Sequence, residues 1–254
     1  MQFDAVFFDS GGTLWDDPAP GAVPPGRSLR EVHDRRGRRL AATMASLDYP
    51  VTAEQVEAAL GDLERDGPGR FGPAYTYTDL VAALAEASGL PLRAEDALLC
   101  ADAYVGPRYA DCLFPGVERT LKALTDAGVH VGLISNTYIP GLIADRLFQA
   151  VGLLKYLRTR ICSGDEGLSK PDPEIFRLAE RHAGLAGRRI LYVGDKYSTD
   201  VAPAHAAGWA AALRRSARTS PADLAGADFA FDALEDLLPF VLGRRRGGRD
   251  AWKG

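Results

Sequence analysis

The chain has 254 residues, which is enough for one large domain or for a core domain with a smaller companion. Its hydrophobic content of 46% and charged content of 25% are typical of a globular protein, and a net charge of −4 argues against nucleic acid or an anionic membrane as a partner. Three widely spaced cysteines without a CxxC pair indicate reduced thiols. The apolar N-terminal stretch is short and is interrupted by Asp4 and Asp9, so we expect a cytoplasmic protein without a membrane span.

Short apolar runs bounded by turn residues alternate with helical patterns along most of the chain. The strands are predicted over residues 5–8, 129–135, 158–163, 190–195 and, more weakly, 210–213, and the helices between them over 117–127, 142–150 and 174–183. This alternation predicts an α/β fold, a Rossmann-like three-layer core with a parallel sheet and right-handed crossovers. Ligands of such sheets bind at the carboxyl ends of the strands.

The segment between the first and second predicted strands has a different character. It lacks a buried strand, starts with a Pro/Gly-rich stretch over 16–27 and then shows helical patterns over 29–47, 53–66, 78–88 and 93–105. We interpret it as a helical cap domain, residues 17–109, inserted after the first strand. The core domain is then expected over 1–16 and 110–242, and the basic, Gly-rich residues 243–254 are expected to form a flexible tail.

Polar motifs stand where the predicted strands end. They are VFFDSGGTL (6–14) with Asp9, LISNT (133–137) with Ser135 and Asn136, GLSKPDPEIF (167–176) with Lys170, and LYVGDKYSTD (191–200) with Asp195 and Asp200. A single motif of this kind is most often a turn or a helix cap. Four of them in this order at strand ends indicate one shared site.

This set of motifs resembles that of the haloacid dehalogenase superfamily, over nearly the whole chain. The pattern SKPDPEIF, followed by GDxxxxD, is similar to that of the phosphatase-like members. The resemblance implies a hydrolase in which Asp9 attacks a phosphoryl group and forms an aspartyl-phosphate. It also implies a Mg²⁺ cofactor held by Asp9, Asp195 and the backbone carbonyl of Gly11.

Physical chemistry supports these roles, because the charge of a phosphoryl group must be offset before a carboxylate can attack it. Mg²⁺ prefers oxygen ligands, and a buried lysine adds positive charge beside the transferred group. The other expected contributors are the Ser135 hydroxyl and Lys170 on the phosphoryl group, backbone N–H groups of Gly11, Gly12 and Asn136 on its oxygens, and Thr13 and Asp200 as supporting residues, with Asp200 orienting Lys170.

Gly11 departs from the phosphatase pattern. Phosphatases of this superfamily carry there a second aspartate that protonates the leaving group and later activates water, and general acid–base catalysis contributes roughly 10²–10⁴-fold. We therefore expect a phosphohydrolase that is slow or restricted to good leaving groups such as acyl phosphates. The alternatives are a 2-haloacid dehalogenase-like hydrolase, which needs no acid, and a non-catalytic protein that binds a phosphorylated ligand or a partner. Phosphonatase chemistry, which uses a cap lysine, is disfavoured, because the chain has no lysine before Lys122 and the cap segment therefore cannot supply one.

Residues outside the four motifs could supply the missing acid or determine substrate specificity. The candidates for a replacement acid are Asp16, Asp17 and Glu166. Six arginines between Arg27 and Arg39 are expected to be mostly solvated, with at least one facing the cleft. The expected partner is a small phosphorylated or otherwise anionic substrate, and the expected assembly is a monomer or a homodimer.

Overall fold

A six-stranded parallel sheet forms the centre of the computed structural model, which describes residues 2–16, 21–217 and 219–243. The strands follow the order β3-β2-β1-β4-β5-β6. They are β1 (Ala5–Phe8), β2 (His130–Ser135), β3 (Thr159–Cys162), β4 (Ile190–Gly194), β5 (Ala210–Arg214) and β6 (Phe229–Phe231). The predicted α/β fold with a parallel sheet is confirmed, and β6 is an additional strand that the sequence patterns did not reveal.

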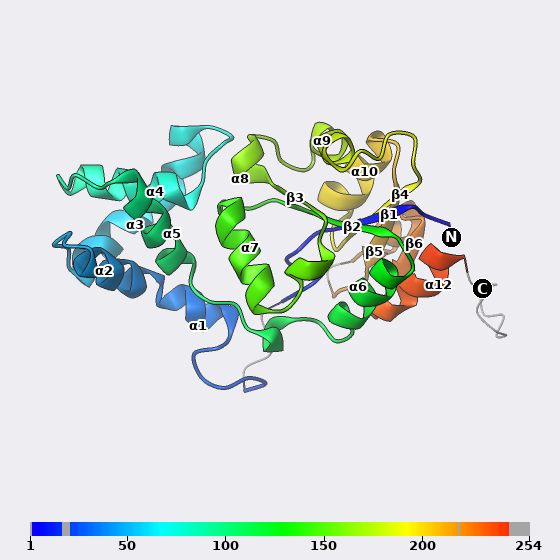
Figure 1. The fold of residues 1–254 in the computed structure, drawn as a ribbon, viewed down its shortest axis with the longest axis horizontal. Coiled ribbons are helices and arrows are strands. Elements are labelled where there is room, and N and C mark those ends of the chain that lie inside the picture. The colour runs from blue at the N-terminus through cyan, green and yellow to red at the C-terminus, as the bar shows by residue number, and fades with distance from the viewer. Residues whose placement is uncertain (1, 17–20, 218, 244–254) are drawn as a thin grey trace.

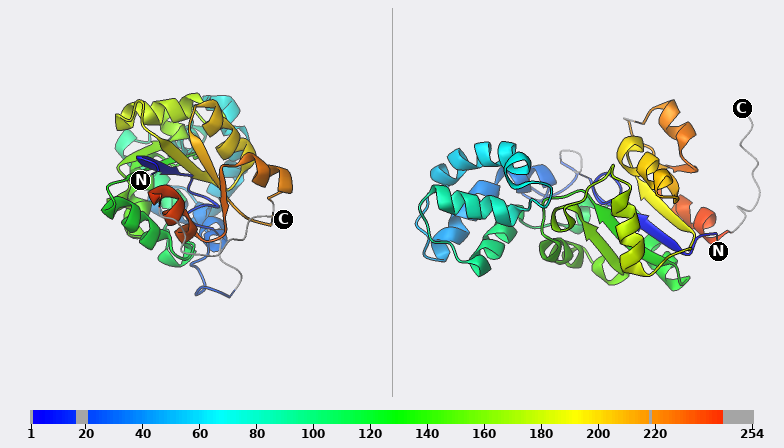
Figure 2. Two further views of the ribbon diagram at one scale, coloured as in Figure 1. Left: turned by 90° about the vertical axis from the view of Figure 1, so that its right-hand side faces the viewer. Right: turned by 90° about the horizontal axis from the view of Figure 1, so that it is seen from above.

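Helices cover both faces of this sheet (Figures 1 and 2). Along β1 the side chains of Val6 and Phe8 enter one apolar cluster, and those of Ala5 and Phe7 enter another. The first cluster includes α6 (Val117–Asp126), α7 (Gly141–Ala150) and α12 (Leu237–Leu242); the second includes α9 (Glu174–Ala183) and α10 (Ala202–Ala206). Because β1 is central and buried on both faces, its carboxyl end lies in the middle of the sheet edge.

Short helical segments complete the core without changing its layers. They are η1 (Ala110–Cys112), η2 (Leu154–Tyr156), α8 (Ser163–Glu166), η3 (Tyr197–Val201), α11 (Pro221–Gly226) and η4 (Leu234–Asp236). The predicted helices over 117–127, 142–150 and 174–183 are found within one residue of their expected ends.

In the described part of the chain between β1 and η1, five helices form a body beside the core, at the left of Figure 1. This helical insertion consists of α1 (Leu29–Asp34), α2 (Arg36–Ser46), α3 (Ala53–Phe71), α4 (Tyr77–Ala87) and α5 (Ala94–Val105). Its helices pack around an apolar cluster separate from those of the sheet, and Ile143 and Leu147 of the core helix α7 also contribute to this cluster. The helix predicted over 29–47 is divided at Arg35, and the one predicted over 53–66 continues to Phe71.

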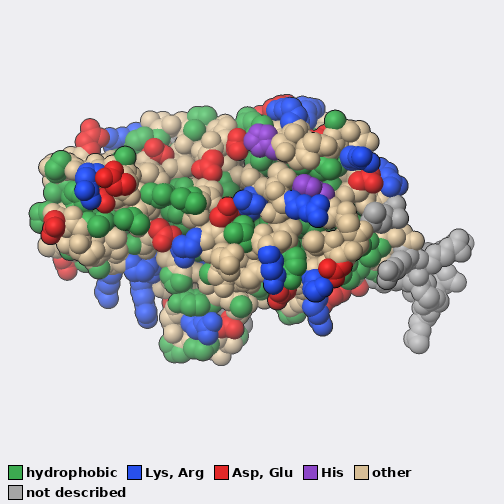
Figure 3. Space-filling model, viewed as in Figure 1, with side chains coloured by type: hydrophobic (Ala, Val, Ile, Leu, Met, Phe, Trp, Pro, Cys, Tyr) green, Lys and Arg blue, Asp and Glu red, His purple; other side chains and the backbone are tan. Residues whose placement is uncertain are grey.

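Within the described residues, no helix combines the length and the apolarity needed to cross a membrane. On the face shown in Figure 3, acidic and basic side chains are interspersed rather than gathered by sign. Asp17 and residues 244–254 of the expected tail lie outside the described residues.

Candidate active site

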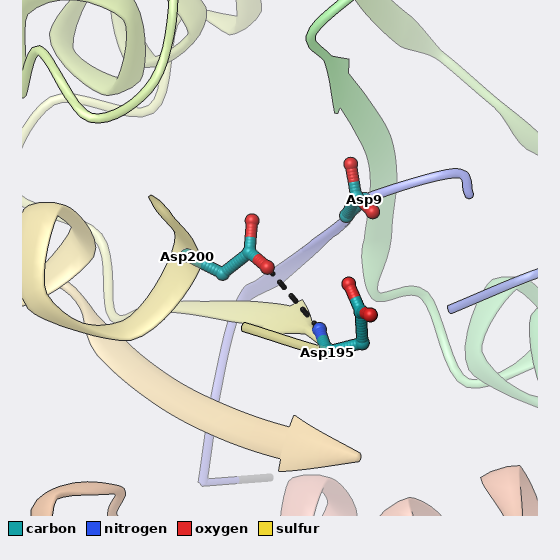
Figure 4. Close-up of side chains that lie close together, drawn as sticks. All are labelled: Asp9, Asp195 and Asp200. Atoms are coloured by element: carbon teal, nitrogen blue, oxygen red, sulfur yellow. Dashed lines mark hydrogen bonds between the residues drawn. The ribbon is translucent and has the colours of Figure 1, made fainter. Parts of the chain in front are cut away.

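Three aspartates meet at the carboxyl ends of the central strands. Asp9 follows β1, Asp195 follows β4, and Asp200 belongs to the helical turn η3. All three are buried, and each contributes a carboxylate oxygen to a group whose members lie within 4.8 Å of one another (Figure 4). The Asp200 Oδ2 atom accepts the backbone N–H groups of Asp195 at 3.2 Å and of Lys196 at 2.9 Å, so it also fixes the loop after β4.

The Lys170 ammonium joins two of these carboxylates. Its Nζ atom donates to Asp9 Oδ1 at 2.8 Å, to Asp200 Oδ1 at 2.7 Å and to the Tyr192 hydroxyl at 2.7 Å. The Tyr192 hydroxyl in turn donates to the carbonyl oxygen of Ile134 at 2.9 Å. The three donor positions of the ammonium are therefore all used, which holds it beside the Asp9 carboxylate.

Burial sets the protonation properties of this group. Desolvation raises the pKa of Asp9 to about 6, against the opposing effect of Lys170. Burial also opposes the charge on Lys170, but the attraction of Asp9 and Asp200 prevails and raises its pKa. Burial raises the pKa of Tyr192 well above its ordinary value, so at neutral pH Lys170 is an ammonium and Tyr192 a neutral phenol.

Asn136 and Ser135 extend the site along the loop after β2. The Asn136 side chain holds both backbone groups of Lys170, donating to its carbonyl oxygen at 2.6 Å and accepting its N–H at 2.9 Å. A hydrogen bond of 2.8 Å joins the hydroxyl groups of Ser135 and Ser10. The Asn136 side chain thus positions Lys170. The two serine hydroxyls lie at the carboxyl end of β1, next to Asp9.

The two glycines after Ser10 differ in their surroundings. A Cβ atom on Gly11 would meet no atom within 4 Å, and the residue is exposed. Gly12 has a φ of +78°, and a Cβ atom there would lie 2.5 Å from Asp195 Oδ2. Its N–H donates to the Trp15 carbonyl at 2.8 Å, so it is engaged within the loop rather than directed to a ligand. Thr13 is fully buried beneath this loop.

The charge and the oxygen atoms of the aspartate cluster determine which ion it can hold. Three carboxylates face one ammonium, which leaves an excess of negative charge in a buried place. Carboxylate oxygens at this spacing are the donors that Mg²⁺ prefers, and the absence of a side chain on Gly12 lets the backbone approach Asp195 closely. The residues present therefore fit such an ion.

Comparison with known proteins identifies the family. The family model of haloacid dehalogenase-like hydrolases matches residues 3–208. The chain belongs to this family. The hydrolase is 27% identical to a ribulose-1,5-bisphosphate 5-phosphatase of Halopiger xanaduensis over 93% of this chain and 98% of that protein. It is also 35% identical to a phosphoserine phosphatase of Thermus thermophilus, a match that spans 50% of this chain and 49% of the relative's length.

Solved structures of the family resemble the hydrolase over most of its length. A 2-haloacid dehalogenase from Pseudomonas syringae is 25% identical, with a TM-score of 0.56 over 95% of this chain and 99% of that one. A phosphatase from Thermococcus onnurineus has the same TM-score of 0.56 at 21% identity, with 94% and 98% coverage, and this likeness concerns the fold alone. The resemblance inferred from the four motifs is thereby confirmed.

Three residues of this site were not indicated by the sequence patterns. Tyr192 reads as an apolar strand residue, Ser10 reads as a turn residue, and Arg214 is the last residue of β5. The Arg214 guanidinium donates to the Gly12 carbonyl at 3.1 Å and lies over the Phe114 ring, 3.6 Å from its centroid. A polar residue at the carboxyl end of a parallel strand is the signal that would have found Arg214.

The candidate replacement acids do not join the aspartate cluster. Asp16 is exposed, and its backbone N–H donates to the Cys112 carbonyl at 3.1 Å. Burial lowers the pKa of Arg214, and the negative charges of Asp16 and Asp195 oppose this shift. Glu166 is the last residue of α8. Burial raises the pKa of the Cys162 thiol at the end of β3, and the negative charge of Glu166 adds to this shift. Of the two, Asp16 lies on the side of the Gly11–Gly12 loop.

The two glycines allow a matched stability test. Gly12→Ala is expected to lower the free energy of unfolding by about 1–2 kcal/mol, because a left-handed backbone disfavours a Cβ atom and this one would press on Asp195. Gly11→Ala, in open space, is expected to change it by less than about 0.5 kcal/mol. Urea unfolding of both variants measures the difference, and equal midpoints would contradict the described loop geometry.

The hydroxyl of Tyr192 allows a second test. Tyr192→Phe removes one acceptor of Lys170 and leaves the Ile134 carbonyl without its donor in a fully buried place. We expect a loss of about 1–3 kcal/mol in the free energy of unfolding, the usual cost of a buried unsatisfied group. Because Asp9 and Asp200 still hold the ammonium, turnover is expected to fall by less than tenfold. An unchanged unfolding midpoint would show that this hydrogen-bond chain does not support the fold.

Proposed function

We propose that this hydrolase removes the phosphoryl group from a small phosphorylated metabolite, with Asp9 as the nucleophile and Mg²⁺ as the cofactor. The observation that carries the proposal is the buried group of Asp9, Asp195 and Asp200 with Lys170 between two of its members. A site with one ammonium and an excess of carboxylates suits a divalent cation together with an anionic substrate. The phosphatase names of relatives such as the ribulose-1,5-bisphosphate 5-phosphatase support the same class.

In the proposed reaction an Asp9 carboxylate oxygen attacks phosphorus, and the bond from phosphorus to the leaving oxygen breaks. Lys170 exchanges its hydrogen bond to Asp9 for one to an oxygen of the transferred group while it keeps Asp200 and Tyr192, and Ser135 donates its hydroxyl hydrogen to another of these oxygens. Asp200 keeps Lys170 in place. Water then attacks the aspartyl-phosphate, releases inorganic phosphate and restores the Asp9 carboxylate.

Mg²⁺ would be held by Asp9, Asp195 and the backbone carbonyl of Gly11, and it supplies positive charge that offsets the charge of the phosphoryl oxygens. The backbone N–H of Gly11 is the remaining glycine donor for those oxygens, because Gly12 donates to Trp15. Thr13 supports the loop from below.

Gly11 gives the proposed enzyme no side-chain acid for the leaving oxygen and no base for the attacking water. Leaving groups of low pKa, such as the carboxylate released from an acyl phosphate, depart without a proton. We therefore propose that acyl phosphates and other activated phosphates are turned over faster than alkyl phosphates.

We further propose that the helical insertion, with boundaries at 17–109, acts as a cap over a core of 1–16 and 110–242. A cavity of about 590 Å³ lies between the two, with walls from α2, α4 and α5 and a floor that includes Asn136 and Ser169. These floor residues are the direct chain neighbours of Ser135 and Lys170, so the cavity opens beside the proposed phosphoryl site. Its size suits a small metabolite.

A second candidate is a 2-haloacid dehalogenase-like reaction, which Gly11 favours because displacement of a halide needs no acid. One experiment separates the two. Phosphate release is measured on alkyl and acyl phosphates, and halide release on 2-haloacids, each with Mg²⁺ and with a chelator. We expect Mg²⁺-dependent phosphate release, whereas halide release that ignores the chelator would move the assignment to the dehalogenase, and silence in both assays would favour a binding protein.

A further inference from the structure

The cavity between the helical insertion and the core is lined by an arginine side chain that has no ion-pair partner among the described residues. Arg108 lines it, in the segment that leads from α5 back to the core. Its Nη1 atom donates to the carbonyl of the adjacent Pro107 at 3.2 Å, and its buried Nε atom has no hydrogen-bond partner among the described residues. A guanidinium offers five N–H groups, so most of its donor capacity is unused.

The neighbouring arginines are engaged, unlike Arg108. Arg36 pairs with Glu64 at 2.5 Å, and Arg146 pairs with Asp102 at 2.5 Å. Arg39 donates to two backbone carbonyls at the end of α5. No carboxylate of the described residues forms an ion pair with Arg108.

A partly buried cation without a counter-charge is unfavourable. Burial lowers the pKa of Arg108; Cys112 and Tyr77 oppose this shift, and the positive charges of Arg146 and Arg39 add to it. The remaining cavity wall adds His33, Arg36 and three tyrosines, and it contains no acidic side chain among the described residues. An anion in the cavity would supply the missing counter-charge and use the fork of N–H groups.

We propose that Arg108 binds a second anionic group of the substrate, a carboxylate or a second phosphate, at the end opposite the transferred phosphoryl group. The substrate class is therefore a phosphate ester with a negatively charged far end. This inference rests on the proposed function, because the first anionic group is taken to occupy the site of Asp9 and Lys170. Arg108 then acts in recognition rather than in the chemical step.

The test uses matched probes that differ at one end only. They are alkane phosphates of three and five carbons that end in a hydroxyl, a carboxylate or a second phosphate. Turnover with Mg²⁺ gives kcat/KM, and calorimetric titration gives the affinity even for a probe that is not hydrolysed. The variants are Arg108→Gln, Arg108→Lys and, as a matched control, Arg38→Gln on α2, whose side chain is 79% exposed.

We expect the wild type to prefer the charged ends over the hydroxyl end, and Arg108→Gln to lose about 10- to 100-fold on the charged probes only, mainly through KM or affinity. Arg108→Lys should restore part of the loss, and Arg38→Gln should match the wild type. Because Arg108 has no ion-pair partner in the fold, Arg108→Gln should keep the thermal midpoint, whereas a structural role would lower it.

Several results would overturn the inference. They are an equal loss on all three ends, no preference in the wild type, and no binding of any probe. The proposed function fails separately, if charged probes bind through Arg108 but no phosphate is released. The carboxylate and bisphosphate arms identify which anion the cavity selects.

Discussion

Asp9→Asn is expected to reduce phosphate release by on the order of 10⁴-fold or more, because an amide is a poor nucleophile and the covalent route is lost. The variant should fold, since Lys170 keeps Asp200 and Tyr192 as partners. The measurement is steady-state turnover at saturating Mg²⁺ on the best substrate, with circular dichroism as a check of folding.

The control for this variant is Asp126→Asn. Asp126 is an exposed aspartate at the end of α6 that pairs with Lys122. Removing its charge is expected to leave turnover unchanged, because a surface ion pair contributes little. Retained activity in a well-folded Asp9→Asn protein would exclude Asp9 as the nucleophile.

Gly11→Asp is expected to raise turnover of alkyl phosphates by about 10²-fold or more, within the range of general acid–base catalysis. The position is open, since a Cβ atom there meets no atom within 4 Å, so the aspartate requires no repacking of the loop. Acyl phosphates, which need no proton on the leaving group, should gain less. The measurement is kcat on one alkyl and one acyl phosphate for both proteins.

Gly11→Asn is the matched variant, because asparagine has the size of aspartate but no carboxyl group that could donate or accept a proton. It should show none of the gain. An equal increase for Asn and Asp would assign the effect to loop conformation. No increase for Asp, in a protein that folds and binds Mg²⁺, would mean that the missing acid does not limit the site.

The core sheet was predictable because its central strands are buried on both faces and read as continuous apolar runs. β6 was missed because its three residues, Phe229–Phe231, are too short for a periodic pattern. The end of α3 was misplaced for a different reason. Gly67 looks like a helix stop, yet it packs so closely on Tyr75 that a Cβ atom would lie 2.6 Å from that ring, and the helix continues to Phe71.

The location of the candidate site was predictable from one rule, that polar residues at the carboxyl ends of parallel strands meet. The structure brings Asp9, Asp195, Asp200 and Lys170 together as expected, while their chemical roles stay proposals. The rule could not reveal Arg108. Its importance depends on the absence of a carboxylate partner, which only the packing of the insertion on the core determines.

The central claim is that a phosphoryl group is transferred to Asp9, and rapid quenching followed by mass spectrometry of the intact protein and its peptides tests it most directly. Because Gly11 supplies no base to activate water, the aspartyl-phosphate should accumulate during turnover of an acyl phosphate. We expect one phosphoryl group on the peptide that contains Asp9, a smaller amount in Gly11→Asp and none in Asp9→Asn. Turnover with the label on another residue, or turnover that Asp9→Asn retains, would contradict the claim.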